Sequence, residues 1–299
     1  MATKMRISSD TQLIIWLIAV FSCVHISSCA SGCRCGESTI DPRVYGGHSV
    51  KPLRYPWVVS VVTQDGKFAC AGTFLTDQWI VTAAHCLQNR TSSDLRINYG
   101  NINWKDSNRT SNVSKLVTHY KYDGSIGHHN DIGLIRLSVA VNFDGQIMPI
   151  CLAKSSKSGK SRYYTTVGWG RTDDEFPDEL QEVDVMHRSE ISCSEWWNGD
   201  EKFDPTIQMC AGITQGSCVG DSGSPLMLRK RGQYILAGIT AYGYDPCGMP
   251  DHPAVYTRVT PFVTWIRSMM LNEKNKLCGE KMADSGGEAK REEEIDQEN

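Results

Sequence analysis

The sequence lacks a clear excess of charge of either sign. Its 299 residues include 31 Lys or Arg and 34 Asp or Glu, which gives a formal net charge of −3. Proteins that bind nucleic acid or anionic membrane surfaces carry concentrated basic charge, and this balanced composition does not provide it. We therefore expect no nucleic-acid partner and no membrane-surface partner.

Long apolar runs are also missing. The apolar run near the N-terminus, LIIWLIAVF, covers only residues 13–21, whereas a membrane-spanning helix needs roughly 20 apolar residues. The run follows Lys4 and Arg6 and precedes small residues up to Ala30, an order that is typical of a secretory signal peptide. We predict a signal peptide over residues 1–30, secretion to the extracellular space and no membrane anchor.

The sequence has no two CxxC pairs of the kind that hold structural zinc. Cys33 and Cys35 are separated by one residue, and no second pair answers them. The chain has 12 cysteines, and an oxidising environment favours disulfides for those beyond the signal peptide. We therefore predict disulfides, and neither a bound metal nor a cofactor.

Three N-glycosylation sequons fit the same compartment. Their acceptors are Asn89, Asn108 and Asn112. Each sequon is weak evidence alone, but together they are typical of surface loops in a secreted glycoprotein. We expect glycosylation at these positions.

No internal repeat of fixed short period is present either. Instead, short apolar or alternating runs are separated by Gly, Asp, Asn and Pro over residues 44–260. Such runs are typical of antiparallel strands in an all-β barrel or sandwich. They predict strands at residues 55–63, 68–76, 79–86, 132–138, 163–170, 234–243 and 254–259.

Two C-terminal segments depart from this pattern. Apolar residues recur at helical spacing from Phe262 to Met270 and predict an amphipathic helix within residues 261–274. Residues 274–299 then hold five Lys or Arg and eight Asp or Glu. Because so polar a segment cannot offset the entropy lost on ordering, we expect a solvated, disordered tail.

Three short stretches carry chemistry-bearing residues. They are VTAAHC (81–86), HNDIGLIRL (129–137) and GDSGSP (220–225), and they supply His85, Asp131 and Ser222. Each alone has a structural explanation, such as a core histidine, a turn aspartate or a glycine-rich turn. Together they are the inventory that activates a serine hydroxyl as a nucleophile.

These stretches, with RVYGG (43–47), resemble the signature blocks of the chymotrypsin-like serine protease family. The resemblance extends from Arg43 to Lys274. It implies two six-stranded antiparallel β-barrels with the active site between them, and a secreted zymogen.

The resemblance also implies a role for each residue of the three stretches. Ser222 is the nucleophile, His85 the general base, and Asp131 the acid that orients the imidazole and stabilises its charged form. A serine hydroxyl needs this help because it is a weak nucleophile until a positioned base accepts its proton. The backbone amides of Gly220 and Ser222 are the implied oxyanion hole.

Activation by cleavage is implied in the same way. A cut after Arg43 would free the ammonium of Val44, which would pair with the carboxylate of Asp221. The resulting organisation is a signal peptide (1–30), a propeptide (31–43), a protease domain (44–273) and a charged tail (274–299).

The family comparison implies four disulfide pairings and leaves two cysteines over. The implied pairs are Cys35–Cys151, Cys70–Cys86, Cys193–Cys210 and Cys218–Cys247. Cys33 and Cys278 lie just outside the recognised domain, so we predict that they pair with each other.

The expected substrate pocket carries no charge. Trypsin-like family members have Asp six residues before the nucleophile, whereas this chain has Gly216, followed by the neutral Ser217. A buried Lys or Arg of the substrate would lack a compensating charge. We predict cleavage after aromatic or large aliphatic residues, in a pocket with further walls at Ala241, Tyr242, Gly243 and Ala254.

Several residues depart from the family pattern. Ala241 replaces a Ser that contacts the triad acid, Tyr242 replaces a Trp of the substrate platform, and Ser224 replaces the last Gly of GDSGGP. These departures affect the expected efficiency more than the reaction type.

The implied partners are protein or peptide substrates, a separate trypsin-like activating protease and protein inhibitors, with the enzyme acting as a monomer. One alternative is a catalytically silent protease-fold binding protein, although such proteins generally lose a triad residue. Another is a secreted disulfide-rich adhesion module, which explains the cysteines and sequons but not the ordered blocks.

Overall fold

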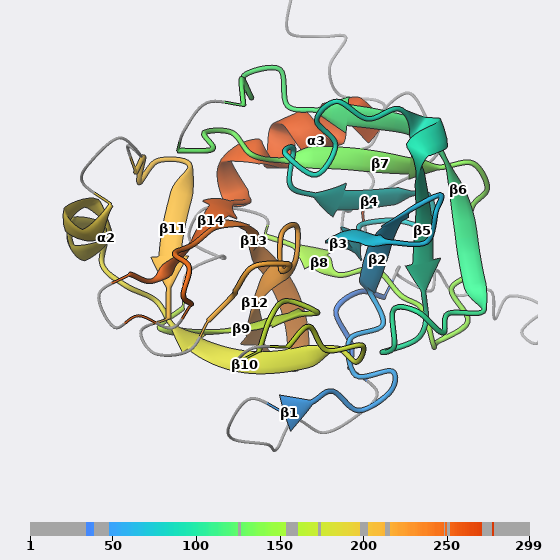
Figure 1. The fold of residues 1–299 in the computed structure, drawn as a ribbon, viewed down its shortest axis with the longest axis horizontal. Helices are drawn as coiled ribbons and strands as arrows, with labels where there is room; N and C mark the ends of the chain where they lie inside the picture. The colour runs from blue at the N-terminus through green and yellow to red at the C-terminus, as the bar shows by residue number, and fades with distance from the viewer. Residues whose placement is uncertain are drawn as a thin grey trace, which may run out of the picture. The chain divides into compact units, whose positions relative to one another are not determined.

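Strands account for most of the regular structure, as the alternating runs predict (Figure 1). The structure is a computed structural model that describes residues 34–38, 48–124, 127–153, 161–172, 175–197, 203–212, 216–247, 249, 252–270 and 277. All of them belong to one unit of the chain, Arg34–Asn299. The predicted signal peptide, most of the charged tail, and Arg43 and Val44 lie outside the described residues.

The first sheet is a closed barrel of six strands in the order β2-β3-β4-β7-β6-β5, all antiparallel. The strands are β2 (Val58–Thr63), β3 (Phe68–Phe74), β4 (Trp79–Thr82), β5 (Leu95–Tyr99), β6 (Arg109–Thr118) and β7 (Gly133–Leu137). A short 3₁₀ helix, η1 (Ser92–Asp94), precedes β5. The apolar core here includes the fully buried side chains of Trp57, Ile80, Ile97 and Leu134.

The second sheet has eight strands in the order β1-β10-β9-β12-β13-β14-β11, with β8 added in parallel to β13. Its strands are β1 (His48–Ser49), β8 (Cys151–Leu152), β9 (Tyr163–Gly168), β10 (Gln181–Met186), β11 (Gln208–Ala211), β12 (Pro225–Lys230), β13 (Gln233–Tyr242) and β14 (Ala254–Arg258). A bridge between His187 and Ala211 joins the end of β10 to β11. The sheet therefore curls into a barrel-like form, to which β1 and β8 are additions.

In the part of the chain that the structure describes, two α-helices lie outside the sheets. Helix α2 (Glu190–Trp196) begins where Ser189 caps it by accepting a hydrogen bond from the amide of Ser192 at 3.1 Å. Helix α3 (Val263–Met270) follows the 3₁₀ helix η2 (Thr260–Phe262) and buries Val263, Ile266 and Met270. Among the described residues, no helix combines the length and apolar character needed to cross a membrane. The predicted all-β fold of two barrels with a C-terminal helix is confirmed.

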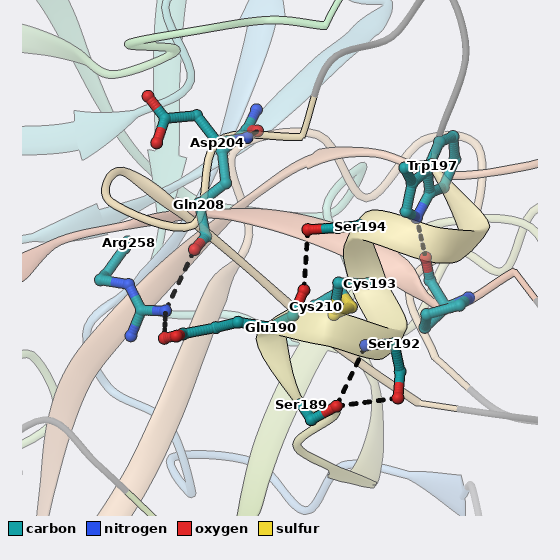
Figure 2. The surroundings of a disulfide bond; sticks show 11 residues. Ser189, Glu190, Ser192, Cys193, Ser194, Trp197, Asp204, Gln208, Cys210 and Arg258 are labelled. Atoms are coloured by element: carbon teal, nitrogen blue, oxygen red, sulfur yellow. Dashed lines mark hydrogen bonds and ion pairs between the residues drawn. A yellow bond between two sulfur atoms is a disulfide. The ribbon is translucent and has the colours of Figure 1, made fainter.

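Within the described residues, four disulfides join segments that are distant in sequence. The bonds are Cys35–Cys151, Cys70–Cys86, Cys193–Cys210 and Cys218–Cys247, the same four pairs that the resemblance implies. Figure 2 shows the Cys193–Cys210 bond, which fastens α2 to β11. The predicted pair of Cys33 and Cys278 lies outside the described residues. Each such bond typically contributes about 2–4 kcal/mol by restricting the unfolded chain.

Candidate active site

His85 and Asp131 meet because the strands that carry them are paired. His85 follows β4, Asp131 precedes β7, and Thr82 of β4 lies opposite Gly133 of β7. The backbone amide of His85 donates to Asp131 Oδ1 at 2.9 Å, and His85 Nδ1 lies 2.7 Å from Asp131 Oδ2. Asp131 is fully buried, whereas the His85 side chain is 21% exposed. The carboxylate thus fixes the imidazole ring and leaves its other edge accessible.

Ser222 comes from the second sheet, in the turn before β12. Gly223, with φ of +80°, packs so closely on the first barrel that a Cβ there would lie 2.3 Å from both Ala71 O and Thr82 Oγ1. The amide of Ala71 in β3 donates to the carbonyl of Ser222 at 2.9 Å. Because Cys70 beside it is bonded to Cys86, these contacts place the Ser222 turn next to the segment that carries His85.

The Ser222 hydroxyl makes no hydrogen bond to the His85 ring within the described part of the chain. Such a bond is often long or poorly aligned without substrate and tightens only in the substrate complex. His85 and Asp131 are therefore in direct contact, whereas Ser222 is placed near them by the backbone contacts of its turn with the first barrel.

The turn leaves two amides available. Gly220, with φ of +95°, has a conformation that favours glycine. In the described chain, the amides of Gly220 and Ser222 donate to no acceptor, whereas those of Asp221, Gly223 and Ser224 are hydrogen-bonded at 3.0, 3.0 and 2.9 Å. Two free neighbouring donors are what an oxyanion site requires.

Asp221 anchors this turn through its side chain. Its Oδ1 accepts from the amide of Gly170 and its Oδ2 from the amide of Cys218, each at 2.8 Å. Burial raises the pKa of Asp221 to about 6, although the two amide donors act to lower it. None of the described cationic side chains pairs with this carboxylate. The turn is thus held by a buried acid that lacks a counter-charge.

A cavity of about 220 Å³ opens beside Ser222. It is lined by Ser217, Cys218, Val219, Gly220, Ser222, Thr240, Ala241, Tyr242, Gly243, Tyr244 and Cys247. The hydroxyl of Ser217 is hydrogen-bonded to Tyr256 Oη at 3.0 Å and to Thr240 Oγ1 at 3.2 Å. The lining carries no acidic or basic side chain, so the cavity is neutral.

Two residues expected in the pocket lie outside this lining. Neither Gly216 nor Ala254 is a lining residue, although Ala254 adjoins the cavity wall at Gly243, where a Cβ would lie 3.8 Å from the Ala254 Cβ. Thr240 and Tyr244 line the cavity although sequence reasoning did not select them. Their proximity to Ala241 and Tyr242 was the only available signal.

An aromatic strip continues the site beyond His85. The ring of His128 lies 5.4 Å from that of His85 and stacks on Tyr242 at 5.5 Å, and Trp197 contacts Tyr242 edge-on at 4.9 Å. His128 and Trp197 were not predicted from the sequence, because both lie in connecting segments without a periodic pattern. These contacts extend the site from His85 to Trp197.

Potential metal-ligand clusters in the described residues coincide with this site. Cys70 and Cys86 are within reach of His85, but their sulfur atoms are bonded to each other. Ligand atoms of His85, His128 and Asp131 lie within 4.8 Å of one another, but His85 and Asp131 are already hydrogen-bonded together. The arrangement favours acid–base chemistry on a serine.

A histidine and an aspartate from one barrel, beside a serine turn from the other, are the arrangement of a serine hydrolase. The profile of the Trypsin family matches residues 44–266, and the chain belongs to this family of trypsin-fold serine proteases. It is 32% identical over 258 residues to the serine proteinase stubble of Drosophila melanogaster, an alignment that covers 79% of this chain. The aligned part is 32% of that relative, so the chain spans about a third of its length.

Proposed function

We propose that this chain is a secreted serine endopeptidase that cleaves peptide bonds through an acyl-enzyme. The observation that carries the proposal is the buried Asp131 carboxylate 2.7 Å from His85 Nδ1, at the junction where the Ser222 turn meets the first barrel. This pair holds the ring in the tautomer that leaves Nε2 as the proton acceptor.

The proposed reaction has two halves. Ser222 Oγ attacks the carbonyl carbon while His85 takes its proton, and the oxygen that becomes negative is stabilised by the amides of Gly220 and Ser222. His85 then protonates the leaving amine, which departs with the C-terminal product. A water molecule, deprotonated by His85, attacks the acyl-enzyme, and the proton returns to Ser222 as the acid product leaves.

The proposed specificity is for aromatic or large aliphatic residues before the cleaved bond. Support comes from the neutral cavity of about 220 Å³ and from Ser217, whose hydroxyl is already hydrogen-bonded. A Lys or Arg side chain would enter without a compensating charge. The proposed determinants of this preference are Ser217, Ala241, Tyr242 and Gly243, which line the cavity, together with Ala254 beside Gly243 and Gly216 beside Ser217.

We further propose that cleavage after Arg43 activates the chain. The new ammonium of Val44 would supply the counter-charge that the buried Asp221 lacks among the described residues, and would order the Gly220 and Ser222 amides. Since an enzyme that prefers apolar residues cuts poorly after Arg43, a separate trypsin-like protease would be the activator.

The proposed compartment is extracellular, with a signal peptide at residues 1–30, a propeptide at 31–43, the protease domain at 44–273 and a tail at 274–299. The four disulfides fit an oxidising environment. Asn89, Asn108 and Asn112 are all exposed, as acceptors of glycans must be.

The decisive experiment treats the chain, cut after Arg43, with a fluorophosphonate probe and then profiles it on a diverse peptide library. We expect probe attachment at Ser222 and cleavage after Phe, Leu or Met. A cut protein that neither reacts nor cleaves would be the silent, partner-binding alternative. Preference for Arg or Lys would leave the catalytic proposal intact and refute the specificity.

A further inference from the structure

Ser224 carries a buried hydroxyl without a partner. The residue is fully buried, and its Oγ makes no hydrogen bond with the residues that the structure describes. Its backbone is fixed on both sides, because its amide donates to Asp221 O and its carbonyl accepts from Thr240 N, each at 2.9 Å. A buried hydroxyl left unpaired costs about 1–3 kcal/mol, so its retention calls for an explanation.

This hydroxyl faces the same small space as the Asp221 carboxylate. A Cβ placed on Gly168 would lie 1.9 Å from Asp221 Oδ1 and 2.8 Å from Ser224 Oγ. The absence of a side chain at Gly168 keeps this space open. The two oxygen atoms therefore border one site, at which both retain capacity to accept a hydrogen bond.

The chemistry of the site defines its occupant. The site offers the buried carboxylate of Asp221, which accepts from two amides, and the buried hydroxyl of Ser224, which has no partner among the described residues. Both groups match an occupant that has positive charge and several N–H donors. A primary ammonium has three donors and meets both requirements. A phosphate, a carboxylate or an apolar side chain would meet neither.

We infer that Ser224 is a positioning residue for the ammonium created by activation, which it holds jointly with Asp221. This inference rests on the proposed activation after Arg43 and assigns it a second acceptor. In the cut chain, one N–H of the ammonium donates to the Asp221 carboxylate and another to Ser224 Oγ. The hydroxyl unpaired in the uncut chain then becomes a contact specific to the active form.

The titratable and charged groups around the site do not compete for this role. Tyr256 of β14 is the titratable neighbour of Asp221, and burial raises its pKa to about 12, so it stays neutral. Arg171, which follows Gly170, pairs with Asp245 instead. Thr240 of β13 and Gly168 of β9 contribute no charge.

The test measures the pH dependence of activity in the cut enzyme, in particular its alkaline limb, where activity is lost as pH rises. An α-amino group ordinarily has a pKa of about 8, and the two acceptors raise it, so the contact is present at lower pH and lost as pH rises through the raised value. We expect Ser224→Ala to move the midpoint of alkaline inactivation down by about one pH unit. Thr73→Val, which removes another buried unpaired hydroxyl on β3, should not move it.

A second measurement compares thermal unfolding in the two forms. In an uncut Arg43→Gln background, Ser224→Ala should raise Tm by about 2–4 °C because it removes an unpaired hydroxyl. In the cut enzyme it should lower Tm, because a contact is lost. A change of the same sign in both forms, or an unshifted alkaline limb, would overturn the role of Ser224.

Failure of the activation proposal gives a different pattern. In that case, uncut Arg43→Gln protein would be fully active, or the cut wild-type enzyme would show no alkaline limb. Either result would show that activity does not depend on the new ammonium, and would overturn this inference as well. An alkaline limb common to the wild type and Ser224→Ala rejects Ser224 alone.

Discussion

Two buried carboxylates, one in each half of the site, have opposite surroundings. Asp131 has both oxygens engaged by one residue, His85, through its amide and its ring. Among the described residues, Asp221 is held by the amides of Gly170 and Cys218, and burial raises its pKa to about 6. The first half of the site, His85 and Asp131, is thus already formed, whereas in the second half, the turn of residues 220–222, Asp221 has no cationic partner among the described residues.

Under the proposed activation, this difference would let one chain hold a formed catalytic pair and remain latent until it is cut. His85 and Asp131 depend on the pairing of β4 with β7, which folding alone provides. The Gly220 and Ser222 amides depend on a turn anchored by Asp221, whose partner we expect only after cleavage. The proposal therefore places the control over activity in the second barrel.

The largest effect on activity should come from a substitution in the His85–Asp131 pair. Asp131→Asn removes the charge that orients His85, so we expect kcat to fall about 10⁴-fold with little change in KM. Steady-state hydrolysis of a peptide ester by the cut enzyme measures it. Asp144→Asn, which removes a surface carboxylate paired with Arg109 at 2.8 Å, is the matched control and should change kcat less than about twofold. Retention of a tenth of the activity by Asp131→Asn would contradict the role.

Breaking the other half should cost less. Asp221→Asn leaves His85 and Asp131 in place but loosens the turn that presents the two amides, so kcat should fall about 10²–10³-fold in the cut enzyme. The same ester assay measures this loss, with Asp184→Asn on the exposed face of β10 as the control. Equal losses for Asp131→Asn and Asp221→Asn would erase the distinction between the halves.

The unpaired charge of Asp221 should also appear in the pH dependence of stability. Its folded pKa of about 6 exceeds the unfolded value of about 3.9, so the stability it adds is complete below the unfolded pKa and is lost as pH rises through the folded one. Uncut Arg43→Gln protein should lose about 2–3 kcal/mol of unfolding free energy between about pH 4 and pH 7 through this group. Urea unfolding at each pH measures it.

The comparison for that experiment is the uncut protein with Asp221→Asn, in which this component of the pH dependence should vanish. Cut wild-type protein should also lose it, because the ammonium lowers the pKa of Asp221. Identical slopes in all three proteins would show that Asp221 is already paired before cleavage.

The smallest effect concerns the pocket of the second half. A Cβ on Gly243 would lie 3.8 Å from the Cβ of Ala254, so Ala254→Gly should widen the pocket there. We expect kcat/KM for Trp relative to Leu before the cut to rise about threefold to tenfold. Ala237→Gly, a buried change on β13 outside the cavity lining, should leave this ratio unchanged.

The sequence could predict the parts of the fold that bury apolar side chains. The runs at β2, β3, β4, β7, β9, β13 and β14 have the expected apolar pattern, whereas β1, β5, β6, β8, β10, β11 and β12 were not predicted. Strand β6 shows why, since only Val113 of its ten residues is buried. It is held by backbone pairing with β5 and β7, which leaves no hydrophobic pattern to read.

The candidate site divides in the same way. His85, Asp131 and Ser222 lie in local blocks that sequence comparison can recognise. His128 and Tyr244 reach the site through connecting segments whose course depends on the packed structure, so no local pattern marks them. The unpaired hydroxyl of Ser224 likewise emerges only once Gly168 lies opposite it.

Each barrel makes a hydrogen bond to a residue of the active site that the other barrel contributes. The carbonyl of Asp131 in the first half accepts from Thr257 Oγ1 of β14 at 2.8 Å, and the carbonyl of Ser222 in the second accepts from Ala71 N of β3 at 2.9 Å. Asp131 and Ser222 are thus each held in place by the opposite barrel. A chimera in which one barrel is replaced by that of a relative should therefore be active only if both of these hydrogen bonds form between the new pair of barrels.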